Sequence, residues 1–227
     1  EGDCWVGVDG GAFVGWDVGG GDDVKGDGVD DILVGAPGTD PALSGDALVI
    51  LGRRGPAPVR VERDGSYSED FFPIFGTGGE GGIGNSLSSI GDFNGDGIDD
   101  IILGASTSTY AGYSNAGKAF IVFGDEDTTE RENLDLATLQ SDEGVEIAAY
   151  YTNGYLGEDV VGIGDINGDG FEDVLIGAPG YSFYDPTLLT TQNAAGIAYV
   201  VYGTNSNPGL PRSLDLASGG ATLIRGL

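Results

Sequence analysis

An acidic segment of nine residues occurs three times in this chain, and its residue types suit the binding of a metal cation. The three copies read DVKGDGVDD at residues 23–31, DFNGDGIDD at 92–100 and DINGDGFED at 165–173. In the second and third copies, side-chain oxygens stand at positions 1, 3 and 5, glycine at position 6 and a carboxylate at position 9. Calcium takes about six to eight oxygen ligands, so this pattern predicts calcium sites.

We expect position 7 to add a backbone carbonyl and position 9 to close each site. The predicted metal ligands are Asp23, Asp27, Val29 and Asp31; Asp92, Asn94, Asp96, Ile98 and Asp100; and Asp165, Asn167, Asp169, Phe171 and Asp173. An EF-hand needs a glutamate at position 12 and a helix after it. Position 12 is Val34, Leu103 or Ile176, so a β-hairpin calcium loop is favoured over an EF-hand or a dockerin.

The residue types at positions 6 and 8 of each loop lead to two further predictions. The position-6 glycine should make the sharp turn, because glycine adopts positive φ at no steric cost. The position-8 side chains should point to solvent; they are Asp30, Asp99 and Glu172.

Lys25 interrupts the pattern in the first loop, where it takes the place of an asparagine at position 3. An ammonium group cannot ligate a cation. Two alternatives follow: the first loop is free of metal and held by Lys25 among its aspartates, or Lys25 swings outward and a cation still binds. The sequence predicts calcium in two loops and leaves the third open.

The residues around each loop repeat as well, with loop-to-loop spacings of 69 and 73 residues. Eight residues before each loop stands a glycine; these are Gly15, Gly84 and Gly157. After each loop come ILVGAP, IILGAS and VLIGAP, which end at residues 37, 106 and 179. A further apolar stretch lies between glycines seven apart, in the pairs Gly45 and Gly52, Gly117 and Gly124, and Gly196 and Gly203. Periodicity of this length predicts a repeat architecture.

The apolar runs are short and rich in Val, Ile, Phe and Tyr, which is typical of β-strands. The third repeat offers four strands, near residues 154–162, 173–177, 197–203 and 221–225, and the last strands of the earlier repeats fall near 71–75 and 145–149. A single short helical patch is expected at 134–140. Four-stranded units repeated radially make a β-propeller.

Together these motifs resemble the FG-GAP repeat family, best known from the propeller heads of integrin α-subunits, over essentially the whole chain. The resemblance implies an all-β fold of three four-stranded propeller blades, an incomplete propeller completed by missing chain or by other subunits. The expected units are residues 1–70, with a leading strand at 4–8 from a preceding blade, then 71–143, 144–218 and an opening strand of a next blade at 219–227. A fragment, a ring of several chains and a head-to-tail polymer all remain open.

The net charge of −28, from 37 acidic and nine basic residues, limits the classes of partner that this protein can bind. Nucleic acid is excluded, because its phosphates require a basic surface. The chain lacks an apolar run long enough to insert into a membrane. Hairpin calcium sites work where calcium is millimolar, which predicts an extracellular or cell-surface location. A high-salt habitat would explain the acidity equally well.

These observations predict a non-enzymatic calcium-binding scaffold for adhesion, recognition or self-assembly, including a filament. Binding would fall to variable loops at 38–44, 107–116 and 180–195, where surface tyrosines suit protein or glycan ligands. The alternative is a lectin-like module or an accessory propeller of a larger secreted enzyme. The chain has no histidine, which removes histidine-based acid–base catalysis.

Overall fold

The computed structural model describes residues 12–38, 44–54, 71–76, 81–126, 134–185, 190–205, 213–215 and 222–225. The expected leading strand at 4–8 and most of the loop at 38–44 lie outside these ranges. Within them the chain is almost entirely β-structure, as predicted. No helix of the described residues is long and apolar enough to cross a membrane.

Twelve strands form three antiparallel sheets that follow one another along the chain. Sheet 1 contains β1 (Val18–Gly20), β2 (Ile32–Ala36), β3 (Asp46–Ile50) and β4 (Phe71–Phe75). Sheet 2 contains β5 (Ile83–Gly91), β6 (Asp100–Ala105), β7 (Lys118–Val122) and β9 (Gly144–Ala148). Sheet 3 contains β10 (Val160–Gly164), β11 (Asp173–Ala178), β14 (Ile197–Val201) and β16 (Thr222–Arg225). The predicted four strands per repeat are confirmed, although β10 begins later than expected.

Two sheets also carry a fifth strand that the sequence analysis did not anticipate. β8 (Leu134–Asp135) pairs in parallel with β4, and β15 (Ser213–Asp215) pairs in parallel with β9. The chain after β7 therefore crosses back to the outer edge of the preceding sheet. The expected helical patch at 134–140 is β8 followed by one turn of 3₁₀ helix, η2 (Leu136–Thr138). Asp135 caps this turn by accepting a hydrogen bond from the Ala137 N–H at 3.0 Å.

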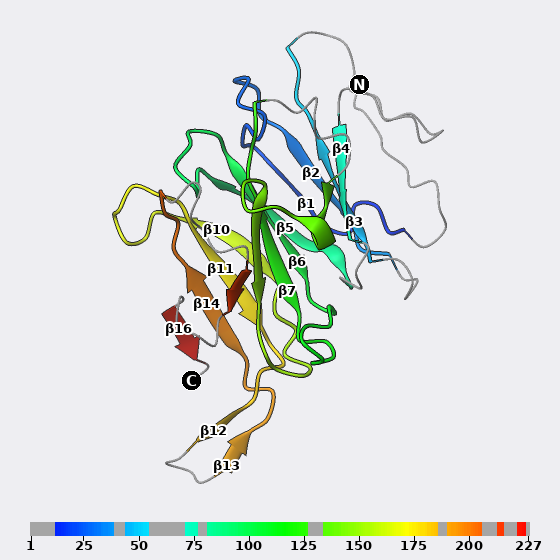
Figure 1. Cartoon of the computed structure of the whole chain (residues 1–227), viewed down its shortest axis with the longest axis vertical. Helices are drawn as coiled ribbons and strands as arrows, with labels where there is room; N and C mark the ends of the chain where they lie inside the picture. Colours follow the sequence, from blue (N-terminus) through cyan, green and yellow to red (C-terminus); the bar gives the residue numbers. More distant parts are fainter. Residues whose placement is uncertain are drawn as a thin grey trace.

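The three sheets lie side by side in chain order, as blades do in a propeller (Figure 1). One apolar core fills the space between sheets 1 and 2, with Leu33, Val49 and Ile74 facing Leu87 and Phe120. A second core fills the space between sheets 2 and 3. The sheets do not close into a ring, so the described fold is a partial β-propeller.

The repeated glycines are explained by the contact between neighbouring sheets. A Cβ on Gly35 of sheet 1 would lie 2.1 Å from the Gly84 carbonyl oxygen of sheet 2. A Cβ on Gly104 of sheet 2 would lie 2.0 Å from the Gly157 carbonyl oxygen of sheet 3. At both interfaces the glycine of one Gly-Ala turn therefore meets the glycine that precedes the next acidic loop. Only residues without a side chain allow backbones to approach so closely.

The acidic loops and a two-stranded hairpin lie at opposite ends of the sheets. The acidic loops lie directly before β2, β6 and β11, at the ends where those strands begin. At the opposite end, β11 leads into a hairpin of β12 (Phe183–Asp185) and β13 (Thr190–Gln192), which extends away from the sheets (Figure 1). The expected unit boundaries at 70/71, 143/144 and 218/219 stay a prediction, and hydrogen bonding places Phe71–Phe75 in the sheet of the strands before it.

Candidate metal loops

The second and third acidic loops fold alike, and the position-1 aspartate organises each of them. Asp92 accepts hydrogen bonds from the N–H groups of Gly95 at 2.6 Å, Asp96 at 3.0 Å and Gly97 at 2.9 Å. Asp165 accepts the same three bonds, from Gly168 at 2.7 Å, Asp169 at 3.1 Å and Gly170 at 2.9 Å. The position-6 glycines Gly97 and Gly170 have φ of +91° and +96°, which confirms the predicted sharp turn.

Positions 3 and 5 are held against each other in both loops. The Asn94 amide donates to Asp96 Oδ2 at 2.9 Å, while Asn94 Oδ1 accepts from the Asp96 N–H at 2.8 Å. Asn167 and Asp169 repeat both bonds at 2.9 and 2.8 Å. The side chains of positions 1, 3 and 5 therefore all form hydrogen bonds within their own loop, in the same pattern in both.

The position-9 aspartate has a second role that sequence reasoning missed. Asp100 is fully buried; its Oδ2 accepts from Phe93 and Asn94 at 2.9 and 3.2 Å, and its Oδ1 accepts from Gly124 at 2.8 Å. Gly124 is the second of the two framing glycines. Asp31 makes the equivalent bond to Gly52 at 2.7 Å and Asp173 to Gly203 at 2.9 Å. The position-9 carboxylate thus ties the loop to the third strand of its sheet, and the framing glycine was the available signal.

Burial changes the acidity of these anchoring carboxylates. Desolvation raises the pKa of Asp100 to about 8 and the pKa of Asp31 to about 6, even though backbone N–H groups act in the opposite direction. For the exposed Asp165 the net effect is the opposite. Hydrogen bonds from the N–H groups of Gly170 and its neighbours outweigh desolvation and lower the pKa of Asp165. The exposed position-1 carboxylate of the third loop is therefore held in the ionised form that a cation requires.

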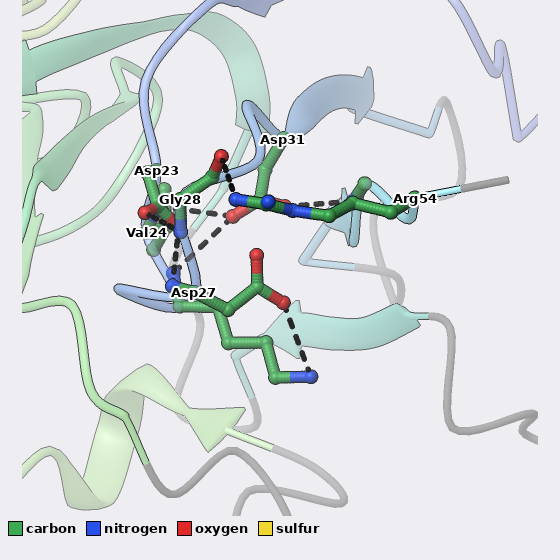
Figure 2. A network of polar contacts seen from close by, with 8 residues as sticks. Asp23, Val24, Asp27, Gly28, Asp31 and Arg54 are labelled. Carbon is green, nitrogen blue, oxygen red and sulfur yellow. Dashed lines mark hydrogen bonds and ion pairs between the residues drawn. The ribbon is translucent and has the colours of Figure 1, made fainter.

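The first loop, drawn in Figure 2, has positive φ at Gly26 and Gly28, as the second loop has at Gly95 and Gly97, but it differs in its side chains. Asp23 accepts from Asp27 and Gly28 at 3.0 and 2.5 Å, as the other position-1 aspartates do. The Lys25 ammonium lies 3.5 Å from Asp27 Oδ2, in a half-exposed ion pair. The Arg54 guanidinium donates to the Gly28 carbonyl at 3.2 Å. Two cationic side chains therefore contact the first loop, whereas position 3 of the other two loops is an asparagine.

Neighbouring loops are joined to each other, which corrects one expectation. Asp99 Oδ2, at position 8 of the second loop, accepts from the Asp23 N–H at 2.9 Å, so the prediction that position 8 points to solvent is wrong for Asp99. Asp22 Oδ2 accepts from the Gly91 N–H of sheet 2 at 3.1 Å. Burial, followed by the charges of Asp99 and Asp30, raises the pKa of Asp22. These contacts join residues of different repeats, so the sequence motif of one repeat does not predict them.

The donor chemistry of the second and third loops fits a hard cation. Within the described residues, no three Asp, Glu or Cys side chains form a ready metal cage. Each loop instead combines two carboxylates with an asparagine amide oxygen at positions 1, 3 and 5, and a carboxylate offers about four lone-pair sites. The anchoring bonds of Asp100 use three of these sites. Ligation by each of the predicted positions 1, 3, 5, 7 and 9 stays a prediction.

The opposite end of sheets 2 and 3 carries a group of tyrosines. The Tyr150 ring packs edge-on against Tyr110 and Tyr113, with centroids 5.2 and 6.0 Å apart. Tyr151 packs against Tyr181 of the next sheet at 4.7 Å. We call these five residues the tyrosine cluster. Tyr113 and Tyr150 are 40% and 41% exposed, so part of the cluster faces solvent.

Comparison with known proteins agrees with this geometry. The sequence model of the FG-GAP repeat matches residues 84–122 and 159–201, which cover the second and third loops and the strands on both sides of each. The chain is 30% identical to integrin alpha-5 of Xenopus laevis over 169 residues, which is 74% of this chain and 14% of that protein. It is 29% identical to integrin alpha-PS2 of Drosophila melanogaster over 130 residues, 56% of this chain and 8% of that protein.

The chain thus spans only a small part of the length of these curated relatives. The repeat match, the two integrin α relatives and the partial propeller of antiparallel sheets nevertheless agree with one another. This chain belongs to the FG-GAP repeat family, and its repeats are integrin-like.

Proposed function

We propose that this chain is a calcium-stabilised propeller segment that serves adhesion or recognition at the cell surface or outside the cell. The observation that carries the proposal is the repeated hydrogen-bond pattern of the second and third loops, in which the side chains of positions 1, 3 and 5 bond within the loop in the same way in both. The kinship with two integrin α-subunits supports the adhesion role.

In this proposal calcium stabilises the loops instead of catalysing a reaction. Bound cations would offset part of the −28 net charge and stiffen the end of the molecule where neighbouring loops are joined. The ligands would be the oxygens of positions 1, 3 and 5, completed by the position-7 carbonyl and the position-9 carboxylate. We propose no enzymatic activity for this chain, because its clustered carboxylates are committed to loop structure.

Calorimetric titration of calcium into chelator-treated protein tests this role. We expect two bound ions per chain, one for each of the second and third loops, and a higher melting temperature in calcium than in chelator. The absence of binding at millimolar calcium would overturn the proposal. A titration with magnesium serves as the control, because magnesium requires a tighter octahedral shell and keeps much of its water.

Ligand recognition would lie at the opposite end of the sheets, on the loops at 107–116 and 180–195 and the tyrosine cluster. The Asn115 amide donates to Asn153 Oδ1 at 3.0 Å, which joins the 107–116 loop to the segment after β9. The buried Lys118 ammonium lies 5.5 Å from the Tyr110 ring centroid and pairs with Glu146 at 3.0 Å. These contacts fix the rings in place, which suits recognition with little loss of conformational entropy.

The second candidate function is a lectin-like module, favoured by the partly exposed rings of Tyr113 and Tyr150. Aromatic faces beside amide groups suit the stacking of a neutral sugar. Binding on a glycan array that is lost on Tyr150→Ala would support this candidate. Array binding that survives Tyr150→Ala and Tyr113→Ala together would assign it to another surface.

A further inference from the structure

The chain has an asparagine directly before a glycine at three places, and this pair is the sequence that most readily loses its side-chain amide. In that reaction the backbone nitrogen of the glycine attacks the side-chain carbonyl carbon of the asparagine. Glycine favours the step because it lacks a Cβ and its backbone turns freely. The fold holds these two groups differently in the three pairs, which are Asn94-Gly95, Asn153-Gly154 and Asn167-Gly168.

In the third loop, hydrogen bonds place a proton acceptor and a proton donor at the two reacting groups. The Gly168 N–H donates to Asp165 Oδ1 at 2.7 Å, so a carboxylate is in position to take the proton that this nitrogen must lose. The Asp169 N–H donates to Asn167 Oδ1 at 2.8 Å, where negative charge develops during the attack. The loop therefore provides a nucleophile, a base and an oxyanion donor for one amide.

The second loop repeats both hydrogen bonds, at 2.6 and 2.8 Å, but it is covered. Asn94 is only 1% exposed, whereas Asn167 lies at the surface. A Cβ on Gly95 would lie 2.5 Å from the Phe171 ring, whereas a Cβ on Gly168 would meet nothing within 4 Å. Of these two loops, the third is therefore the one that offers access to water and room for the peptide to turn.

The remaining pair, Asn153-Gly154, has an exposed asparagine but a restrained backbone. The Asn153 N–H donates to the Ser114 carbonyl at 2.9 Å, and Asn153 Oδ1 accepts from the Asn115 amide at 3.0 Å. Gly154 is buried, and its N–H donates at 3.1 Å to the Tyr151 carbonyl, which cannot receive a proton as a carboxylate does. Exposure of the asparagine together with a carboxylate at the glycine N–H thus distinguishes the third loop from the other two pairs.

We propose that Asn167 is a site of self-catalysed deamidation, in which the third loop modifies its own position-3 residue. A bond forms between the Gly168 nitrogen and Asn167 Cγ, and the bond from Cγ to Nδ2 breaks. The amide nitrogen leaves as ammonia, carrying the proton that Asp165 has taken from the Gly168 nitrogen. Water then opens the cyclic imide, at Cγ to give aspartate or at the backbone carbonyl to give isoaspartate.

The modification changes the structure of the third loop. The Asn167 amide now donates to Asp169 Oδ2 at 2.9 Å, and the carboxylate of either product has no proton to donate there. Both products therefore lose this bond between positions 3 and 5 and set a second carboxylate against Asp169. Isoaspartate also adds a methylene group to the main chain between positions 3 and 4, so the loop no longer matches the second one.

This inference rests on the proposed function in one respect, the effect of calcium on the rate of modification. If the oxygens of positions 1 and 3 ligate a cation as proposed, Asp165 no longer takes up a proton and the Asn167 side chain no longer turns. Calcium should then slow the modification by about tenfold or more, and magnesium should slow it less. The preference for Asn167 over the other two asparagines does not depend on calcium.

Peptide mapping by mass spectrometry tests the proposal on the whole 227-residue protein, incubated in chelator at mildly alkaline pH. The exchange of an amide NH2 for OH raises the mass, and this gain is measured separately at each asparagine. We expect modification at Asn167 to be about tenfold faster or more than at Asn94 and Asn153, since a small cost of local opening slows a reaction by this factor. Equal rates at the three sites, or an unmodified Asn167, would overturn the proposal.

Asp165→Asn distinguishes catalysis by the carboxylate from simple exposure of the amide. Asp165 accepts hydrogen bonds from three N–H groups of the loop, so its loss loosens the loop, and exposure alone predicts faster modification. Loss of the base instead predicts modification of Asn167 that is slower by about tenfold or more in chelator. A faster rate would overturn the self-catalysed mechanism. Asp92→Asn makes the same change in the second loop and should leave the rate at Asn167 unchanged.

Calcium binding measured on the same samples separates this inference from the proposed function. Protein that binds calcium but leaves Asn167 unmodified in chelator contradicts only the deamidation. Protein that binds no calcium and modifies Asn167 selectively, at the same rate in calcium, magnesium and chelator, contradicts only the proposed function. Selective modification of Asn167 in chelator that calcium suppresses supports both.

Discussion

The first acidic loop and the second reach nearly the same backbone conformation with different side-chain chemistry. In both, the position-1 aspartate accepts from the N–H groups of positions 5 and 6, and the buried position-9 aspartate accepts from a framing glycine. The second loop places Asn94 against Asp96. The first places Lys25 beside Asp27 and Arg54 on the Gly28 carbonyl.

This comparison separates the architecture of the loop from its capacity for metal. The backbone turn depends on glycines and on two aspartates that accept N–H groups, and these are common to all three loops. The first loop keeps this turn with Lys25 at position 3, so the turn itself does not depend on an oxygen there. If the position-3 oxygen ligates a cation as proposed, one substitution could remove a metal site and leave the repeat in place.

The largest expected effect is on the pH dependence of stability in the absence of calcium. Asp31 and Asp100 have pKa values raised to about 6 and about 8 from 3.8, so between these limits the folded state binds more protons than the unfolded state. Stability should therefore fall as pH rises from about 4 to about 8, by a few kcal/mol in order of magnitude. Melting temperatures recorded in chelator across this range measure the effect.

Calcium should distinguish the two loops in the same experiment. A cation bound at the second loop would oppose the protonation of Asp100. Calcium should therefore reduce the fall in folding stability with rising pH, mainly above about pH 6. The part that arises from Asp31 should persist if the first loop takes no calcium. A melting temperature in chelator that is constant or rises between about pH 6 and 8 would contradict the assignment.

The next effect in size comes from position 5. Asp169→Ala removes a predicted ligand of the third loop and should cost about 2–3 kcal/mol in saturating calcium, or about 5–10 °C in melting temperature. The same variant should respond less to chelator. Asp27→Ala is the matched control in the first loop, where only the half-exposed pair with Lys25 is lost, and about 0.5 kcal/mol is expected. Equal losses in the two variants would show that both loops bind calcium, or neither.

Much of this fold could be predicted from the sequence because its signals recur at fixed spacing. The strand at Phe71–Phe75 and the strand that begins at Asp173 lie where the apolar runs predicted them. The position-6 turns were predictable because only glycine tolerates the positive φ found there. The sequence also shows that glycine recurs at the positions of Gly35 and Gly84 in every repeat. Only the structure shows that these two glycines touch across two sheets.

The parts that escaped prediction depend on contacts between repeats. β8 and β15 are short and pair in parallel with strands of the preceding sheet, so their own sequences carry no periodic signal. Asp99 bonds to a backbone N–H that lies 76 residues away in sequence. The anchoring role of Asp100 was hidden by its expected role as a ligand, because the same carboxylate suits both.

The smallest expected effect, and the sharpest test of the loop comparison, is Lys25→Asn. The substitution supplies the oxygen that position 3 lacks, so the number of calcium ions bound per chain should rise by one in a calorimetric titration. In calcium the gain in stability should be about 1–2 kcal/mol, since the new site is offset by the lost ion pair. Lys25→Ala removes the same charge without adding an oxygen and should bind no further ion. Equal ion counts for the unmodified protein and Lys25→Asn would mean that the first loop already binds calcium with Lys25 turned outward, or that Arg54 still occupies the turn.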